Sequence, residues 1–321
     1  MGEWKDEATE NPAQTGTQSH LDAVERDARD RLPFPLTLLV GTRFLREGFA
    51  ERPETVPLQP LTGLLIGILA TAAPLLCIKR YADFQGALML SSGIYVFLLA
   101  WLGGFANLQG FGRACAAVAC RFRSVETRRD VLAGRRIAAV FASSGCTAML
   151  VCMKFLTVYL LFAHAALLGG EAVLLGFVLC ATPVLARVAM LDLLPNACNG
   201  LDSEHLPKTP IVAIWIWRVA LLFAFFAFFL IFVASEAPLT LRGALEFLSS
   251  EGFMENLPVA SAVFATIPPF AGALLPVVYW KRQTMRFFDR RGGASVPKAV
   301  CECAETTILI GFLLSIELFY L

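Results

Sequence analysis

The chain contains 321 residues with a mass of 35.0 kDa, and 57% of these residues are hydrophobic, giving a mean hydropathy of +0.64. Charged residues make up only 17% of the chain, against about 25% in typical soluble domains. This composition excludes a water-soluble globule, a disulfide-stapled secreted domain and a disordered chain, and the net charge of +1 provides no field that would attract nucleic acid. The sequence predicts an all-α fold, a polytopic bundle of transmembrane helices surrounded by membrane lipid.

Residues 1–31 form a polar, acidic segment that predicts a disordered cytosolic tail. They carry eight carboxylates, and they offer too little apolar surface to build a folded core. No basic stretch followed by an apolar core stands at the start, so we expect no signal peptide. We assign residues 32–321 to one membrane domain, which opens with the short apolar segment 33–44, a buried or interfacial helix.

Seven apolar segments follow, and most of them approach the length of about 20 residues that crosses a hydrocarbon core. Inside lipid each segment must be helical, because unpaired backbone groups find no water there. The last segment is short and contains Glu317, so we expect six to seven spans. The segments comprise residues 58–78, 86–106, 137–163, 171–190, 211–234, 259–280 and 306–321.

The distribution of lysine and arginine predicts the orientation of these spans, because cytoplasmic loops carry an excess of both. The segment 107–136 contains seven arginines, and the segment 281–305 contains six basic residues. By contrast, the segment 164–170 has none and the segment 235–258 has one. We therefore place 107–136, 187–210 and 281–305 in the cytoplasm, together with the N-terminus, and expect a multi-pass protein of the cytoplasmic (inner) membrane.

Two basic residues within the predicted spans are candidates for function, since a charge in hydrocarbon is costly unless it is paired or hydrated. Lys154 lies in mid-span, where it either holds a phosphate in a cavity, forms an ion pair or snorkels to the interface. Arg218 lies among tryptophans near a span end, and snorkelling is the favoured interpretation. The two basic segments either form one anion pocket, since guanidinium binds phosphate bidentately, or only follow the charge bias and touch anionic lipid headgroups.

Several short motifs occur in a fixed order along the chain. In chain order they are LLVGTRF with Thr42 and Arg43, PLTGLLIG at 60–67, GGFANLQGFGRACAA at 103–117, the mid-span Lys154, Ala186-Arg187, and Gly292-Gly293 leading to Glu302 and Glu305. Together these motifs resemble the cobalamin synthase family, whose activity is that of an adenosylcobinamide-GDP ribazoletransferase. The resemblance covers roughly residues 36–321, and it implies a helical membrane enzyme with its working face toward the cytoplasm.

The resemblance also implies a reaction and a set of site residues. The family joins α-ribazole, or its phosphate, to adenosylcobinamide-GDP and releases GMP, with Mg²⁺ held by the carboxylates of an H-L-D-G-x-x-D-x-x-D-G motif. Here Asn107 stands at the histidine of that motif, and Gln109 and Arg113 stand at two of its aspartates. Glu302 and Glu305 are the remaining candidate metal ligands. The candidate substrate-binding residues are Arg43, Arg121, Arg123, Arg128, Arg129, Lys154 and Arg187.

Three functions remain open on the sequence. The first is ribazole transfer with Mg²⁺ as cofactor. The second is a catalytically inactive relative that binds a corrinoid or a nucleotide, or that organises membrane partners, because neutral amides and an arginine are poor magnesium ligands. The third is a small transporter, suggested by Pro268-Pro269 within a span and by Lys154.

Overall fold

The structure is a computed structural model, and its described part is helical. Within that part there are nine helices and no strands, which confirms the predicted all-α class. The predicted tail, the segment 33–44 and Arg43 lie outside the described residues. The described residues are 58–81, 86–103, 105–134, 143–167, 172–194, 210–235, 257–288 and 295–320.

Every predicted apolar segment contains a helix, and the predicted loop 107–136 contains two more. The last long helix begins at Ser295 and has 26 residues, so it is longer than the apolar segment 306–321 alone indicated. The helices are α3 (Gln59–Arg80), α4 (Ala87–Leu102), α5 (Ala106–Ala119), α6 (Val125–Leu132), α8 (Ser144–Leu167), α9 (Ala172–Leu191), α10 (Ile211–Ser235), α12 (Leu257–Phe287) and α13 (Ser295–Tyr320).

Four described helices are long and apolar enough to cross a membrane, judged by length and composition. They contain the stretches Gln59–Arg80, Ser144–His164, Leu174–Leu191 and Ser295–Ile316. A fifth span results if α4 and α5 count as one, although the chain bends by 82° between them. Phe105, at this bend, has a left-handed backbone with φ of 56°. The chain is thus a helical protein with several helices of membrane-spanning length.

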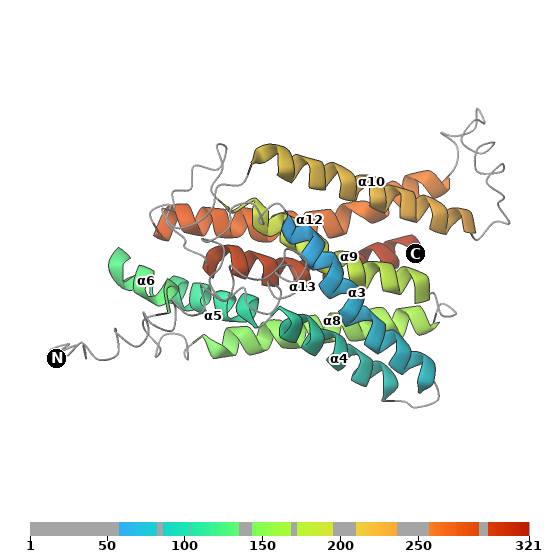
Figure 1. Ribbon diagram of the computed structural model, residues 1–321, viewed down its shortest axis with the longest axis horizontal. Helices are drawn as coiled ribbons and strands as arrows, with labels where there is room; N and C mark the ends of the chain where they lie inside the picture. Colours follow the sequence, from blue (N-terminus) through green and yellow to red (C-terminus); the bar gives the residue numbers. More distant parts are fainter. Residues whose placement is uncertain are drawn as a thin grey trace, which may run out of the picture. The chain divides into compact units, whose positions relative to one another are not determined.

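Helices α9 and α13 form the centre of the bundle. Helix α13 packs against α5, α8, α9 and α12, and α3 packs against α4 and α9. Figure 1 shows α12 and α13 running side by side, with α5 and α6 next to the start of α13. The residues 181–191 of α9 are all buried, which is expected of a helix surrounded by other helices.

Two glycines on α3 permit its close approach to α9. A Cβ atom at Gly63 would lie 2.6 Å from the Pro183 carbonyl oxygen, and one at Gly67 would lie 2.5 Å from the Cys180 carbonyl oxygen. Small residues four positions apart let helix backbones touch inside a membrane, where dispersion contacts must replace the hydrophobic effect. The PLTGLLIG motif therefore fixes the packing of α3 on the central helix.

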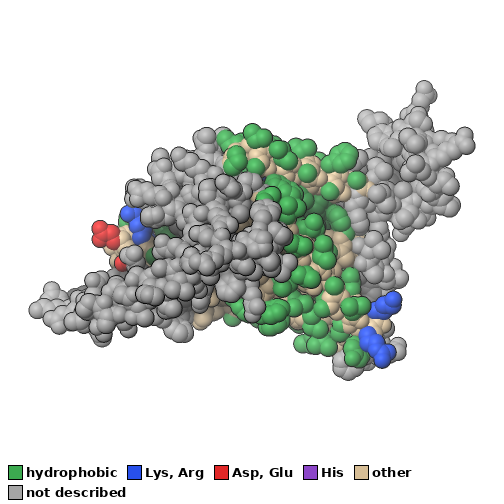
Figure 2. Space-filling model, in the orientation of Figure 1, with side chains coloured by type: hydrophobic (Ala, Val, Ile, Leu, Met, Phe, Trp, Pro, Cys, Tyr) green, Lys and Arg blue, Asp and Glu red, His purple; other side chains and the backbone are tan. Residues whose placement is uncertain are grey.

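The outer surface of the described helices is apolar. Large hydrophobic side chains are exposed on α3, α4, α8, α10 and α12, among them Leu76, Met149, Val219 and Leu275. Figure 2 shows one face of this surface, on which hydrophobic side chains dominate and the visible charged side chains lie at two ends. An exposed apolar surface of this extent is typical of contact with lipid rather than with water.

Candidate functional site

A cluster of buried charges connects three helices in the middle of the bundle. The Lys154 ammonium group on α8 donates to the Glu302 carboxylate and, at 2.8 Å, to Glu305 Oε2, both on α13. Arg187 Nη1 on α9 lies 4.0 Å from Glu305 Oε1 and donates to the Pro183 carbonyl oxygen at 2.9 Å. Two cations therefore face two carboxylates, and their formal charges cancel.

The local sequence explains why these groups meet. Glu302 and Glu305 are three residues apart, so both carboxylates lie on one face of α13. Lys154 is only 2% exposed and Glu305 3%, so neither reaches solvent. Removing one member of such a cluster leaves an uncompensated buried charge, which costs about 3–5 kcal/mol. Of the interpretations open for Lys154, the structure shows the ion pair.

Helix α5 carries Asn107, Gln109 and Arg113, the residues at which the sequence resembles the acidic motif of the cobalamin synthase family, and it packs against the first turns of α13. Asn107 Nδ2 donates to Cys301 Sγ at 3.3 Å, next to Glu302. Gly110 lies so close to α13 that a Cβ atom there would be 3.1 Å from the Ser295 carbonyl oxygen and would also overlap the Lys298 side chain. Asn107 and Gly110 are therefore in contact with the helix that carries the charge cluster.

The other two motif positions face away from this contact. Gln109 is exposed. The Arg113 guanidinium lies against Gly134, where a Cβ atom would be 2.7 Å from Arg113 Cζ. Gly134 follows the end of α6 with φ of +78°, so Arg113 lies beside a helix C-terminus, where a cation is electrostatically favoured. This placement gives Arg113 a packing role that the sequence did not indicate.

The donor atoms at these positions do not fit a magnesium site. Mg²⁺ is normally held through carboxylate oxygens, whereas Asn107 and Gln109 offer neutral amides and Arg113 a cation. Glu302 and Glu305 supply carboxylates, but these accept hydrogen bonds from Lys154. Across the described part of the chain, no group of three or more His, Cys, Asp or Glu residues could hold a metal ion.

The segment from α5 to α6 and the adjoining ends of α12 and α13 gather basic side chains; we call this region the cationic end. The Arg128 guanidinium carbon lies 5.9 Å from the centre of the Phe287 ring at the end of α12. Ser295 Oγ, at the start of α13, donates to the Leu132 carbonyl oxygen of α6 at 2.7 Å. These contacts bring the two basic segments of the sequence together, as the anion-pocket interpretation requires.

Cations greatly outnumber acids at the cationic end. Glu126 and Asp130 are the acids of the described stretches that form it, 105–134, 281–288 and 295–298. Arg121 and Arg123 are exposed, so part of this charge is open to a ligand. The basic residues are Arg113, Arg121, Arg123, Arg128, Arg129, Lys281, Arg282, Arg286 and Lys298.

Arg128 and Lys298 are the buried members of this group, and Arg128 is the one of the two that belongs to α6. Arg128 is 9% exposed, and its Nη1 donates to the Arg121 carbonyl oxygen at 3.3 Å. Its Nε is buried and has no hydrogen-bond acceptor among the described residues. A buried donor without an acceptor costs about 1–3 kcal/mol, so a bound oxyanion that accepted this bond would stabilise the region.

The candidate substrate residues thus fall into two groups. Arg121, Arg123, Arg128 and Arg129 belong to the cationic end, whereas Lys154 and Arg187 belong to the buried charge cluster. Sequence reasoning missed the pairing of Lys154 with the glutamates and the burial of Arg128. The signal for the pairing was present, because a mid-span lysine requires a partner and Glu302 and Glu305 share one helix face.

No protein-family model, curated protein or solved structure matches the chain. The resemblance to the cobalamin synthase family therefore rests on the motifs quoted from the sequence. The geometry described above is independent of that resemblance, since it follows from the contacts of this chain's own residues.

Proposed function

We propose that the protein is a multi-pass membrane protein of cobalamin synthase type that binds a phosphorylated ligand, a corrinoid nucleotide or a related nucleotide, at its cationic end. The observation that carries this proposal is the buried Arg128 guanidinium, whose Nε lacks an acceptor among the described residues. Around it stand further arginines, and guanidinium groups match phosphate oxygens bidentately. The ligand's phosphates are held by arginine instead of by Mg²⁺.

The proposed arrangement in the membrane has seven spans, α3, α4, α8, α9, α10, α12 and α13. The N-terminus and the cationic end lie in the cytoplasm, and the membrane is the cytoplasmic one. Two observations support this orientation. Basic residues gather at the cationic end, where α4, α12 and α13 meet α5 and α6. Arg218 and Trp215 lie near the start of α10. An excess of basic residues is typical of the cytoplasmic side, and tryptophan is typical of a membrane interface on either side.

We propose binding rather than ribazole transfer as the activity of this chain. In the related family the transfer depends on carboxylates that hold Mg²⁺, and phosphoryl transfer in general needs a cation to neutralise developing charge. Arginines supply such charge, but no carboxylate stands at Asn107, Gln109 or Arg113 to position a nucleophile. The buried glutamates are engaged with Lys154 and so belong to the scaffold.

The direct test uses GDP as the probe and the purified full-length protein. We expect Arg128→Gln to weaken GDP binding by about 1.5–3 kcal/mol, the range for a hydrogen bond to a charged group. Arg80→Gln, at the far end of α3, is the matched control and should leave GDP affinity unchanged. Equal affinity of wild type and Arg128→Gln would contradict the proposed site.

A second assay distinguishes binding from catalysis. The protein is incubated with adenosylcobinamide-GDP, α-ribazole and Mg²⁺, and GMP release is followed. We expect no GMP above that of a sample without protein. Steady GMP release, lost in Arg128→Gln, would instead establish the transferase.

A further inference from the structure

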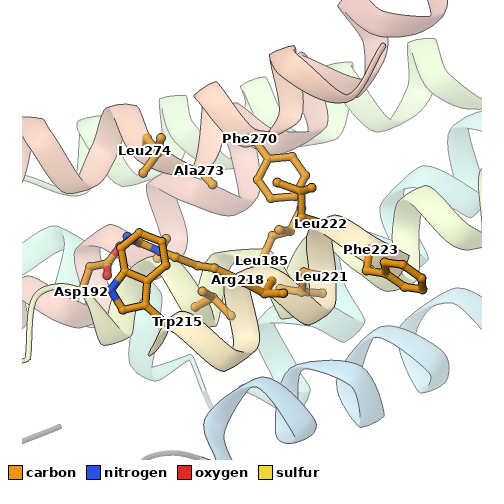
Figure 3. Close-up of a pocket in the computed structure, with 13 residues that line it drawn as sticks. Leu185, Asp192, Trp215, Arg218, Leu221, Leu222, Phe223, Phe270, Ala273 and Leu274 are labelled. Carbon is orange, nitrogen blue, oxygen red and sulfur yellow. The ribbon is translucent and has the colours of Figure 1, made fainter. Parts of the chain in front are cut away.

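A pocket lies between α9, α10 and α12, and none of the residues that line it belongs to the cationic end. Its volume is 410 Å³, within the range of about 300–1,000 Å³ for small-molecule sites. Apolar side chains line most of it, including Leu185, Leu222, Phe270 and Leu274. Figure 3 shows Asp192, Trp215 and Arg218 together at one end, with Phe223 at the opposite end.

Among the described residues, the charged groups at the polar end of this pocket sum to a net positive charge. The Arg218 guanidinium donates to the Asp192 carboxylate and lies 5.4 Å from the Trp215 ring. Burial raises the pKa of Asp192 above its ordinary value, and Arg218 and Lys281 oppose that rise, so Lys281 of α12 is close enough to act on this carboxylate. Among the described residues, Arg218 pairs with this acid and Lys281 acts on it electrostatically. A guanidinium has five N–H donors, more than one carboxylate oxygen uses.

The apolar part of the pocket extends along the helices away from these charges. With a rise of about 1.5 Å per residue, Phe223 lies about 7 Å beyond Arg218 along α10, and Phe270 lies about 16 Å beyond Lys281 along α12. Both helices therefore present a cation first and then a stretch of apolar side chains. A phospholipid matches this order, because its anionic headgroup is followed by an apolar acyl chain.

We propose that this pocket binds one anionic phospholipid, with its phosphate on Arg218 and one acyl chain along α10 and α12. Charge complementarity selects the headgroup, because Arg218 and Lys281 outweigh Asp192 and favour a net negative lipid over a zwitterionic one. Trp215 stands at the depth of the headgroup, where tryptophan is enriched. The site is independent of the phosphorylated ligand proposed above and involves none of its residues except Lys281, whose charge both regions share.

The test measures the binding of single lipids to the purified full-length protein by native mass spectrometry. Phosphatidylglycerol and phosphatidylcholine with identical acyl chains are the probes. We expect wild type to bind phosphatidylglycerol about tenfold more tightly, because Arg218 and Lys281 repel the choline cation of phosphatidylcholine whereas the glycerol headgroup carries no cation. Equal binding of the two lipids by wild type would overturn the proposal.

Three variants locate the site. Arg218→Gln removes the phosphate contact, and the double variant Asp192→Asn/Arg218→Gln does so without leaving a lone buried carboxylate. We expect both to bind the two lipids within about twofold of each other. Arg80→Gln removes an exposed charge from the end of α3 and should keep the preference. A preference that persists in the double variant would show that the anionic lipid binds elsewhere.

A fourth variant tests the apolar part of the pocket, where the acyl chain is proposed to bind. Leu274→Trp adds bulk to an exposed side chain that lines the pocket, so the protein should fold while the groove is filled. We expect it to bind less of both lipids than wild type. Unchanged binding of both would contradict the placement of the acyl chain.

Discussion

Lys154 joins α8 to α13 by donating to two carboxylates on the same helix face, and Arg187 adds α9 to the same cluster. A buried ion pair of this kind adds little net stability compared with a well-packed apolar core, but it becomes costly when one partner is lost. The cluster therefore specifies which faces of the three helices meet.

The substitution Lys154→Met tests this role. Methionine keeps the length and removes the charge, so two glutamates remain buried beside Arg187 alone. We expect the free energy of unfolding to fall by about 3–5 kcal/mol, measured by thermal unfolding of the purified protein in detergent.

Removing one opposing charge as well should restore part of this loss. We expect Lys154→Met/Glu302→Gln to unfold at a higher temperature than Lys154→Met, because Glu305 then remains beside Arg187 and the buried charges cancel again. A Lys154→Met variant as stable as wild type would show that the cluster does not hold the helices together.

At the scale of elements, the contact of α3 with α9 depends on glycine. Gly63→Ala places a methyl group against the Pro183 carbonyl oxygen, and such overpacking costs about 1–3 kcal/mol. Gly145→Ala on α8 is the matched control, since a Cβ atom there meets nothing within 4 Å. We expect thermal unfolding to show destabilisation by Gly63→Ala and wild-type or greater stability for Gly145→Ala. Equal stability of the two variants would contradict the packing role assigned to Gly63 in the PLTGLLIG motif.

The sequence predicted the apolar part of each long helix, because runs of hydrophobic residues are visible without any tertiary information. The sequence did not predict the first three turns of α13. Lys298, Glu302 and Glu305 are charged and therefore indicated a polar loop, whereas in the structure all three are buried. The sequence also indicated a loop in the region of α5 and α6. There the helices depend on contacts such as Asn107 with Cys301, which link residues far apart in the chain.

At the scale of the whole molecule, the predicted orientation places the two ends of the bundle on opposite sides of the membrane. Thiol labelling of intact cells checks this with single cysteines in a background without the native ones. We expect Tyr81→Cys, after α3, to react with an impermeant reagent from outside. Arg123→Cys, before α6, should react only after permeabilisation. If both cysteines reacted from the same side of the membrane, the predicted number of spans between them would be wrong.

In the proposed site, arginine takes the place of magnesium in holding the phosphorylated ligand. The measurement that tests it most directly is the affinity of the purified protein for adenosylcobinamide-GDP, determined by equilibrium binding in excess EDTA and again in excess Mg²⁺. Because neutral amides and guanidinium do not attract Mg²⁺, we expect the two dissociation constants to agree within about threefold. Binding that is lost in EDTA and restored by Mg²⁺ would contradict the account.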